Sequence, residues 1–204
     1  GFLKSSGDRF VFEDGTRAKF WGTCFSAGAN FPTHEQSEKI ARRLAKFGVN
    51  IVRTHHADAN WAKPNMFEFD KGNPRKDNTL SFDPRSLDRF DYLIYCLKQE
   101  GIYIYLDQLV HRKFKSGDNV DAVDELSNAA KPYSNFDRRL IELQKKYSHD
   151  LWTHVNPYTE LAYKDDPAIV MMEFANENDL FTQKVTLEPY RTRLEKTYRK
   201  WAEE

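Results

Sequence analysis

Apolar residues along the chain recur with two alternating spacings, one typical of helices and one typical of strands. Helical spacing occurs in three segments, at residues 40–47, 87–97 and 140–151. Short apolar runs of strand type occur at residues 20–26, 50–55, 102–110 and 168–174. We therefore expect strands that alternate with helices, the pattern of βαβ units around a parallel sheet.

Local signals mark where the predicted helices begin. Thr33, with Gln36 three residues later, has the pattern of a capping box at the first helix. Asp83 is suited to cap the second helix, because Pro84 follows it at the first helical position. Ser134 is expected to cap the third. Glycine follows the first two helices and an Asn-Pro pair follows the third, so each has a stop signal.

Both ends of the chain carry separate predicted elements. An Asp-Gly pair, a strong hairpin turn signal, separates the apolar segments 3–12 and 19–25. We expect a short β-hairpin over residues 1–18 that leads into a single α/β domain over residues 19–204. The last part of that domain, residues 188–204, is expected to form an amphipathic helix.

The connections between the predicted elements differ in length. Long polar or aromatic stretches follow the second and third strands, at residues 56–82 and 111–133, whereas the helix-to-strand turns are brief. This asymmetry is typical of barrels and doubly wound sheets, whose functional residues lie at the carboxyl ends of the strands. No Gly-x-Gly-x-x-Gly motif follows the first strand, which disfavours a dinucleotide-binding sheet.

Composition limits the possible partners. The 204 residues include 31 basic and 31 acidic side chains, and without a basic cluster we expect binding to neither nucleic acid nor membrane. No apolar run approaches the ~20 residues that span a bilayer, and no signal peptide is visible. Cys24 and Cys96 match no metal spacing, so both are expected to be buried free thiols.

The stretch DDPAIVMMEFANEN, residues 165–178, places a carboxylic acid between two amides directly after a buried strand. Glu177 lies between Asn176 and Asn178. A polar turn after a strand explains such a triplet. The alternative is a catalytic acid, because glycosidic cleavage needs a carboxylic acid that protonates the departing oxygen and then, as a base, activates water.

Three segments resemble strands of the cellulase- and mannanase-type glycoside hydrolases, a clan of retaining (β/α)8 enzymes that includes glycoside hydrolase family 5. Phe20-Trp21-Gly22-Thr23 resembles their first strand, the segment 49–53 their second, and the segment 168–177 their fourth, which ends in Asn-Glu. The resemblance covers nearly the whole chain in the right order. It implies an α/β fold of the (β/α)8 TIM-barrel type, of which this chain supplies about the first four βα units after the hairpin.

The resemblance also implies roles for individual residues. Glu177 would be the general acid/base, and Asn176 would hydrogen-bond the sugar hydroxyl next to the reacting carbon. Arg53 would orient the carboxylates at the base of the site. Arg53 is equally suited to a structural ion pair with Glu173, whose alternation places it on the same side of its strand as Glu177.

Further sugar-binding side chains are expected on the loops that follow the strands. His55 and His56 are expected to bind sugar hydroxyls, and Trp61 either to stack on a pyranose face or to anchor its loop. His111 is expected to reach the site from the next loop, unless it is a surface residue. Asn178 completes the predicted substrate-binding set. Adjacent strand residues point apart, so we expect no metal site at the two neighbouring histidines.

One part of the family pattern is missing from the sequence. The family's nucleophile is a glutamate after the seventh strand, whereas this chain falls short of the ~250 residues of a whole barrel. Glu173 and Asp107 are expected to lie deeper in the barrel. The sequence therefore predicts a half-barrel whose open edges associate with the missing C-terminal half or with a second copy of the chain.

The leading interpretation is the N-terminal half of a retaining glycoside hydrolase that acts on β-linked glucans or mannans without a cofactor. We expect it to be secreted or periplasmic, since a chain that starts at Gly1 fits a mature secreted form, although a trimmed chain starts the same way. One alternative is a non-catalytic carbohydrate-binding or assembly module. Another is a metal-dependent amidohydrolase-like barrel that uses His55, His56 and His111, although the usual His-x-His spacing is absent.

Overall fold

A parallel sheet lies at the centre of the computed structural model, which describes residues 1–70 and 76–204. The sheet has the strand order β3-β4-β5-β8, so strands adjacent in space follow one another along the chain. The four strands are β3 (Gly22–Ser26), β4 (Ile51–His55), β5 (Tyr103–Leu109) and β8 (Ile169–Ala175). Each predicted strand is confirmed to within two residues. Of the long loop predicted after the second strand, residues 71–75 lie outside the described part.

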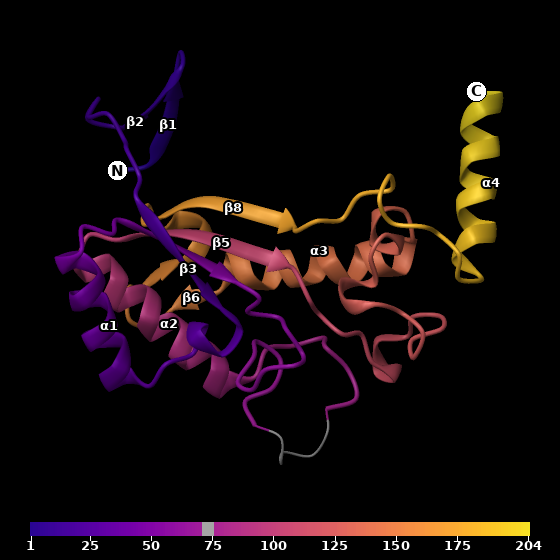
Figure 1. Ribbon diagram of the computed structural model, residues 1–204, viewed down its shortest axis with the longest axis horizontal. Helices are drawn as coiled ribbons and strands as arrows, with labels where there is room; N and C mark the ends of the chain where they lie inside the picture. The colour runs from indigo at the N-terminus through magenta and orange to yellow at the C-terminus, as the bar shows by residue number, and fades with distance from the viewer. Residues whose placement is uncertain (71–75) are drawn as a thin grey trace.

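Three helices connect these strands: α1 (His34–Lys46), α2 (Pro84–Gln99) and α3 (Arg138–Thr153). All three pack on the same face of the sheet (Figure 1). The sheet is therefore wound in one direction only, as in a barrel, and is not doubly wound.

The helix starts follow local capping chemistry. The capping box of α1 is confirmed, because Gln36 N donates to Thr33 Oγ1 and Thr33 N donates to the Gln36 side chain. Asp83 caps α2 as predicted. The prediction that Ser134 caps the third helix is wrong, because Asp137 accepts from Leu140 N and starts α3. A carboxylate at this position also interacts favourably with the helix dipole, which a serine hydroxyl does less well.

The N-terminal hairpin forms, but its main turn is not the predicted one. β1 (Leu3–Ser6) pairs with β2 (Arg9–Phe12) across a turn at Gly7, whose φ of +60° suits glycine. The Asp-Gly pair forms a second reversal, in which Gly15 N donates to the carbonyl of Phe12.

The remaining elements are short or peripheral. β6 (Val155–Asn156) and β7 (Leu161–Ala162) form a small antiparallel pair, and α4 (Tyr190–Glu203) is the predicted final helix. In the described connections, 3-10 turns occur at η1 (Ala27–Asn30), η2 (Ser116–Asp118), η3 (Asn128–Ala130), η4 (Tyr133–Asn135) and η5 (Tyr163–Asp165). None of the helices in the described ranges is long and apolar enough to cross a membrane.

Alternation along the strands gives the sheet two different faces. Val52, Ile104 and Leu106 are fully buried against the helices and belong to the main core. The neighbouring residues point to the other face, which is called the inner face below. None of the helices in the described part of the chain covers this face (Figure 1). Cys24 lies on this face and is exposed, which corrects the expectation of two buried thiols, whereas Cys96 is buried.

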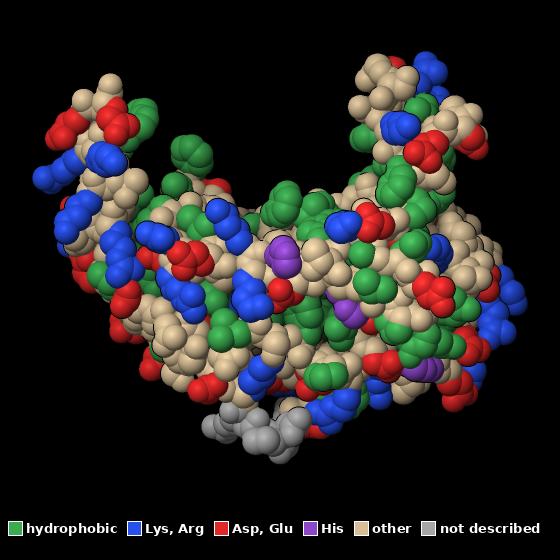
Figure 2. Space-filling model, turned by 180° about the vertical axis from the view of Figure 1, so that it is seen from behind, with side chains coloured by type: hydrophobic (Ala, Val, Ile, Leu, Met, Phe, Trp, Pro, Cys, Tyr) green, Lys and Arg blue, Asp and Glu red, His purple; other side chains and the backbone are tan. Residues whose placement is uncertain are grey.

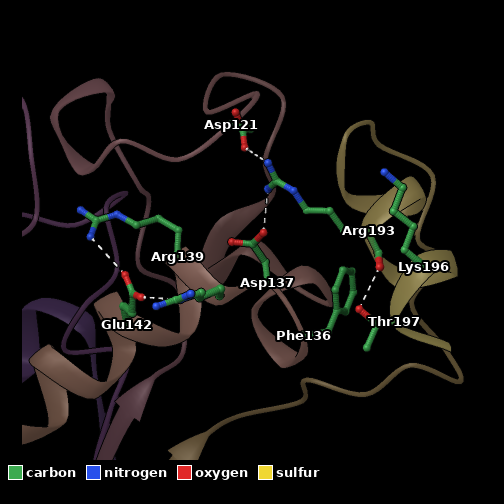
Figure 3. Close-up of a pocket in the computed structure, with 9 residues that line it drawn as sticks. Asp121, Phe136, Asp137, Arg139, Glu142, Arg193, Lys196 and Thr197 are labelled. Atoms are coloured by element: carbon green, nitrogen blue, oxygen red, sulfur yellow. Dashed lines mark hydrogen bonds and ion pairs between the residues drawn. The ribbon is translucent and has the colours of Figure 1, made fainter. Parts of the chain in front are cut away.

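Helix α4 is attached mainly by its first turns (Figure 3). Tyr190 is buried, and Arg193 forms ion pairs of 2.5 Å with Asp121 and 2.8 Å with the α3 cap Asp137. A groove of about 550 Å³ between α3 and α4 is lined largely by such paired charges. The far end of α4 exposes Trp201, and the surface between the hairpin and α4 is hollowed and partly hydrophobic (Figure 2).

Candidate functional site

Arg53 is the centre of a charge network on the inner face. Its Nη2 donates to Glu173 Oε2 at 2.5 Å and to Asn176 Oδ1 at 3.2 Å, and its Nε lies 2.8 Å from Asp107 Oδ2. Burial alone would lower the pKa of Arg53, but the hydrogen bonds and charges of the two carboxylates together raise it. The guanidinium thus links three strands, β4, β5 and β8.

Asp107 is the deepest carboxylate of this network. Its side chain is fully buried, and besides Arg53 it contacts His55 Nδ1. Burial raises the pKa of Asp107, and the hydrogen bonds from His55 and Arg53 oppose that rise. His55 is therefore held against a carboxylate at the base of the site rather than standing free at its rim.

His56, Trp61 and His111 form a second group, called the ring cluster below. The His56 and His111 ring centroids are 4.9 Å apart, and Trp61 Nε1 donates to His111 Nδ1 at 3.0 Å. Since His111 Nδ1 accepts this hydrogen bond, a neutral His111 carries its proton on Nε2. The expectation that the His55 and His56 side chains point apart is wrong, because their ring centroids are 3.8 Å apart. His56 comes directly after β4 with a φ of +57°, so the alternation of the strand no longer applies to it.

The ring cluster is uncharged near neutral pH. Burial, the largest cause, and the charges of the neighbouring His55 and His111 together lower the pKa of His56 to about 4. Burial also lowers the pKa of His111, as does the charge of Lys131. Neutral imidazoles and an indole can hydrogen-bond sugar hydroxyls and pack against sugar C–H groups.

The metal-site alternative requires several ligand side chains that converge on one point. Across residues 1–70 and 76–204, no three His, Cys, Asp or Glu side chains are placed to hold one metal ion. The geometry therefore gives no support to the alternative of a metal-dependent amidohydrolase.

The Asn-Glu-Asn triplet follows β8 directly, and its three side chains have different surroundings. Asn176 is nearly buried and accepts from Arg53. Glu177 has a φ of +48° and is exposed, and within the described part of the chain its carboxylate makes no hydrogen bond or ion pair. Its charge nevertheless acts on His111 and Lys131, where it opposes the lowering of their pKa. Glu177 therefore lies within electrostatic reach of the ring cluster.

Asn178 is held by a neighbouring turn. Its Nδ2 donates to Ser134 Oγ at 2.8 Å, and its Oδ1 accepts from Asn135 at 3.2 Å. This amide thus links the end of β8 to η4, and its role as a sugar contact stays a prediction.

Lys131 is a site residue that the sequence did not indicate. Burial lowers the pKa of its ammonium group, and the charges of Glu177, Asp58 and Glu173 oppose that effect. Its loop is fixed close to His111, because Ala129 N donates to the carbonyl of Arg112 at 2.7 Å. Nothing in the sequence marks this lysine beyond its position in the long loop after the third strand.

Comparisons with known proteins place the fold. No protein-family model matches the sequence, and no curated protein sequence does either. The structure is similar to an endo-1,4-beta-mannanase from Rhizomucor miehei, with a TM-score of 0.63 and 21% identity over 87% of this chain and 48% of that one. A glycoside hydrolase family 5 mannosidase from Rhizomucor miehei has a TM-score of 0.64 and 17% identity over 88% and 49%. An endo-1,4-beta-D-mannanase from Thermotoga petrophila has a TM-score of 0.52 and 20% identity over 78% and 45%.

The chain therefore spans about half the length of these solved structures. At such identities the likeness is one of fold. The chain has the fold of about half of the (β/α)8 barrel of these structures, and the resemblance seen in the sequence is confirmed at the level of the fold.

Proposed function

We propose that the chain is half of the catalytic domain of a retaining glycoside hydrolase that cleaves β-linked mannans or glucans, with Glu177 as the general acid/base. The observation that carries the proposal is the pair of hydrogen bonds from Arg53 to Glu173 and Asn176. These bonds hold the carboxyl end of β8, and Glu177 is the residue that follows Asn176 there. Its fold context adds support, because the similar solved structures include mannanases.

The charge network explains why Glu177 is the carboxyl suited to proton transfer. Asp107 and Glu173 are both held by ion pairs with Arg53, so neither side chain is free to reach a bridging oxygen. Glu177 lies outside this network and is exposed at the strand end. A carboxyl group free of ion pairs can approach the bridging oxygen, protonate it as the bond breaks, and then activate water as a base.

The ring cluster is the proposed contact surface for the sugar. Trp61 is 57% exposed, and its N–H is already bonded to His111, so its ring face is the part available to a pyranose. His56 and His111 offer hydrogen bonds without charge. A polymeric substrate also fits a secreted or periplasmic location, since polysaccharides are degraded outside the cytoplasm.

The nucleophile is proposed to come from a C-terminal half-barrel segment that covers the inner face. In the described ranges, β3 and β8 each have an edge without a partner strand, and Trp21 and Phe174 are exposed. The similar solved structures are about twice as long as the part that this chain matches. Sedimentation with and without that segment tests this. A heterodimer supports it, a stable homodimer assigns the face to a second copy, and monomers in both samples contradict it.

The catalytic role is tested with aryl β-glycosides that have good leaving groups, using the chain together with the segment that completes the barrel. Glu177→Ala is expected to lose turnover, and azide is expected to restore it with formation of a β-glycosyl azide, because azide needs no general base. Glu125→Ala is the matched control, because Glu125 is an exposed carboxylate on the loop after β5. This variant should keep the parent activity. Equal activity of Glu177→Ala and the parent would contradict the proposal.

A non-catalytic carbohydrate-binding or assembly module is the second candidate. It is favoured by the exposure of Glu177, which lacks the apolar surroundings that tune a general acid. Binding of manno- or cello-oligosaccharides with equal affinity by the parent and Glu177→Ala, without turnover in either, would support this module.

A further inference from the structure

Asp58 is a buried carboxylate that the proposed reaction does not use. It lies on the loop after β4 and is 1% exposed. Its Oδ2 accepts from the backbone N–H of Val110 and of Arg112, and its Oδ1 accepts from that of His111, each at 2.9 Å. One side chain thus binds three consecutive amides of the segment that leaves β5.

These bonds join the two loops that supply the ring cluster. His56 and Trp61 flank Asp58 on the loop after β4, and His111 is one of the residues whose amide Asp58 binds. The Trp61–His111 hydrogen bond crosses between the same two loops. We propose that Asp58 is a positioning residue, which holds the loops after β4 and β5 together so that the ring cluster forms one continuous wall.

That this wall faces a sugar rests on the proposed function, but the positioning itself does not. A carboxylate is needed because each of its two oxygens accepts, whereas an asparagine offers one oxygen and turns an N–H₂ group toward the remaining amide. Asp58→Asn therefore loses at least one of the three bonds and places two donors against each other.

Protonation of Asp58 has the same consequence. Burial raises the pKa of Asp58 to about 6, although its three backbone hydrogen bonds and the charge of Arg112 oppose the rise. A proton on one oxygen removes an acceptor that the amides use. The parent below this pH should therefore resemble Asp58→Asn at any pH.

Several ionisable groups act on Asp58 or line the small cavity beside it. They are His111, Arg112, Lys113 and Lys115 on the loop after β5, Lys63 and Glu68 on its own loop, Lys131 after η3, and Tyr147 on α3. His111 is the histidine among them, and its pKa is lowered from the ordinary 6.5, so it also titrates in the acidic range. The test must therefore separate these two groups.

The arrangement of the ring cluster is followed through the fluorine resonance of Trp61, in the chain labelled with 5-fluorotryptophan. Of its four tryptophan signals, that of Trp61 is assigned with Trp61→Phe. In the parent we expect the Trp61 fluorine resonance to move with a midpoint near pH 6. In Asp58→Asn at pH 8 the resonance should already have the position of the parent at low pH. The amides of residues 110–112 should also exchange on the order of tenfold faster in this variant.

Asp91→Asn is the matched control. Asp91 is another buried aspartate, 2% exposed, which bonds His154 and Tyr163 at a different part of the fold. The Asp91→Asn substitution should lower the free energy of unfolding without moving the Trp61 signal.

Two results would overturn the proposal. One is an unchanged Trp61 resonance in Asp58→Asn at pH 8, and the other is a transition near pH 6 that persists in Asp58→Asn. If Asp58→Asn does not fold, the titration is repeated in His111→Gln, where the transition must remain if Asp58 causes it and must vanish if His111 does. None of these readouts needs hydrolysis, so an inactive chain would leave the positioning role standing.

Discussion

The two faces of the central sheet are made by alternate residues of the same strands, yet they have opposite chemistry. On the outer face, Val52, Ile104 and Leu106 are fully buried in apolar contacts with the helices. On the inner face, Arg53 and Asp107 from the same strands form an ion-paired network. One backbone thus carries a face that stabilises the fold and a face that holds the candidate site, and substitutions on the two should have separable effects.

The largest effect is expected on the outer face. Leu106→Ala leaves a cavity in the main core and should lower the free energy of unfolding by about 3 kcal/mol, measured by urea denaturation. The Trp61 fluorine signal should stay in place, because Leu106 points away from the inner face. A loss below about 1 kcal/mol would show that the core rearranges to fill the cavity.

An intermediate effect is expected from Arg53→Met on the inner face. Asp107 and Glu173 lose their cationic partner, so the free energy of unfolding at pH 7 should fall by about 1–3 kcal/mol, less than for a fully buried pair because the Arg53 side chain is 30% exposed. The loss should shrink toward pH 4, because burial raises the pKa of Asp107 and a protonated Asp107 no longer needs a cationic partner. A loss that is equal at both pH values would contradict the network.

A smaller effect on the free energy of unfolding is expected from a change of pH, and the raised pKa of Asp58 determines its sign. The native pKa of Asp58 is about 6, above its ordinary value of 3.8, so between these values the native state binds more protons than the unfolded state. The contribution of Asp58 to the free energy of unfolding therefore increases by about 1 kcal/mol as the pH falls from 7 to 5. Denaturation of the parent and Asp58→Asn at both pH values measures it, and a difference that is constant or of opposite sign would contradict the raised pKa.

The smallest effect on stability is expected at Cys24. Cys24→Ser should change the free energy of unfolding by less than about 0.5 kcal/mol, because the thiol is exposed on the inner face. Iodoacetamide should label Cys24 and leave the buried Cys96 unmodified in the folded chain. Protection of Cys24 when the completing segment is added would show that this segment covers the inner face.

The sequence was sufficient for features that depend on local patterns. Strand positions follow from apolar runs, and the caps Thr33 and Asp83 follow from side chains that bond amides two or three residues away. Alternation along β8 was also enough to suggest the Arg53–Glu173 pair. At the third helix, two residues able to cap occurred three positions apart, and the sequence favoured Ser134 over the true cap Asp137.

The rest of the candidate site depends on contacts between distant loops. The ring cluster forms because His56 leaves the strand with a left-handed backbone and because Asp58 binds amides more than 50 residues away. Neither feature has a local sequence signal. Lys131 was missed for the same reason, since its loop is fixed by a backbone bond to Arg112.

The guanidinium of Arg53 reaches across β5 to a carboxylate on β8, so it sets the distance between strands that are not neighbours in the sheet. We therefore expect this side chain to hold the relative positions of β4 and β8 within the chain itself. A complementary half would therefore meet a pre-shaped template, and the speed of assembly would depend on orientation during collision instead of on strand rearrangement.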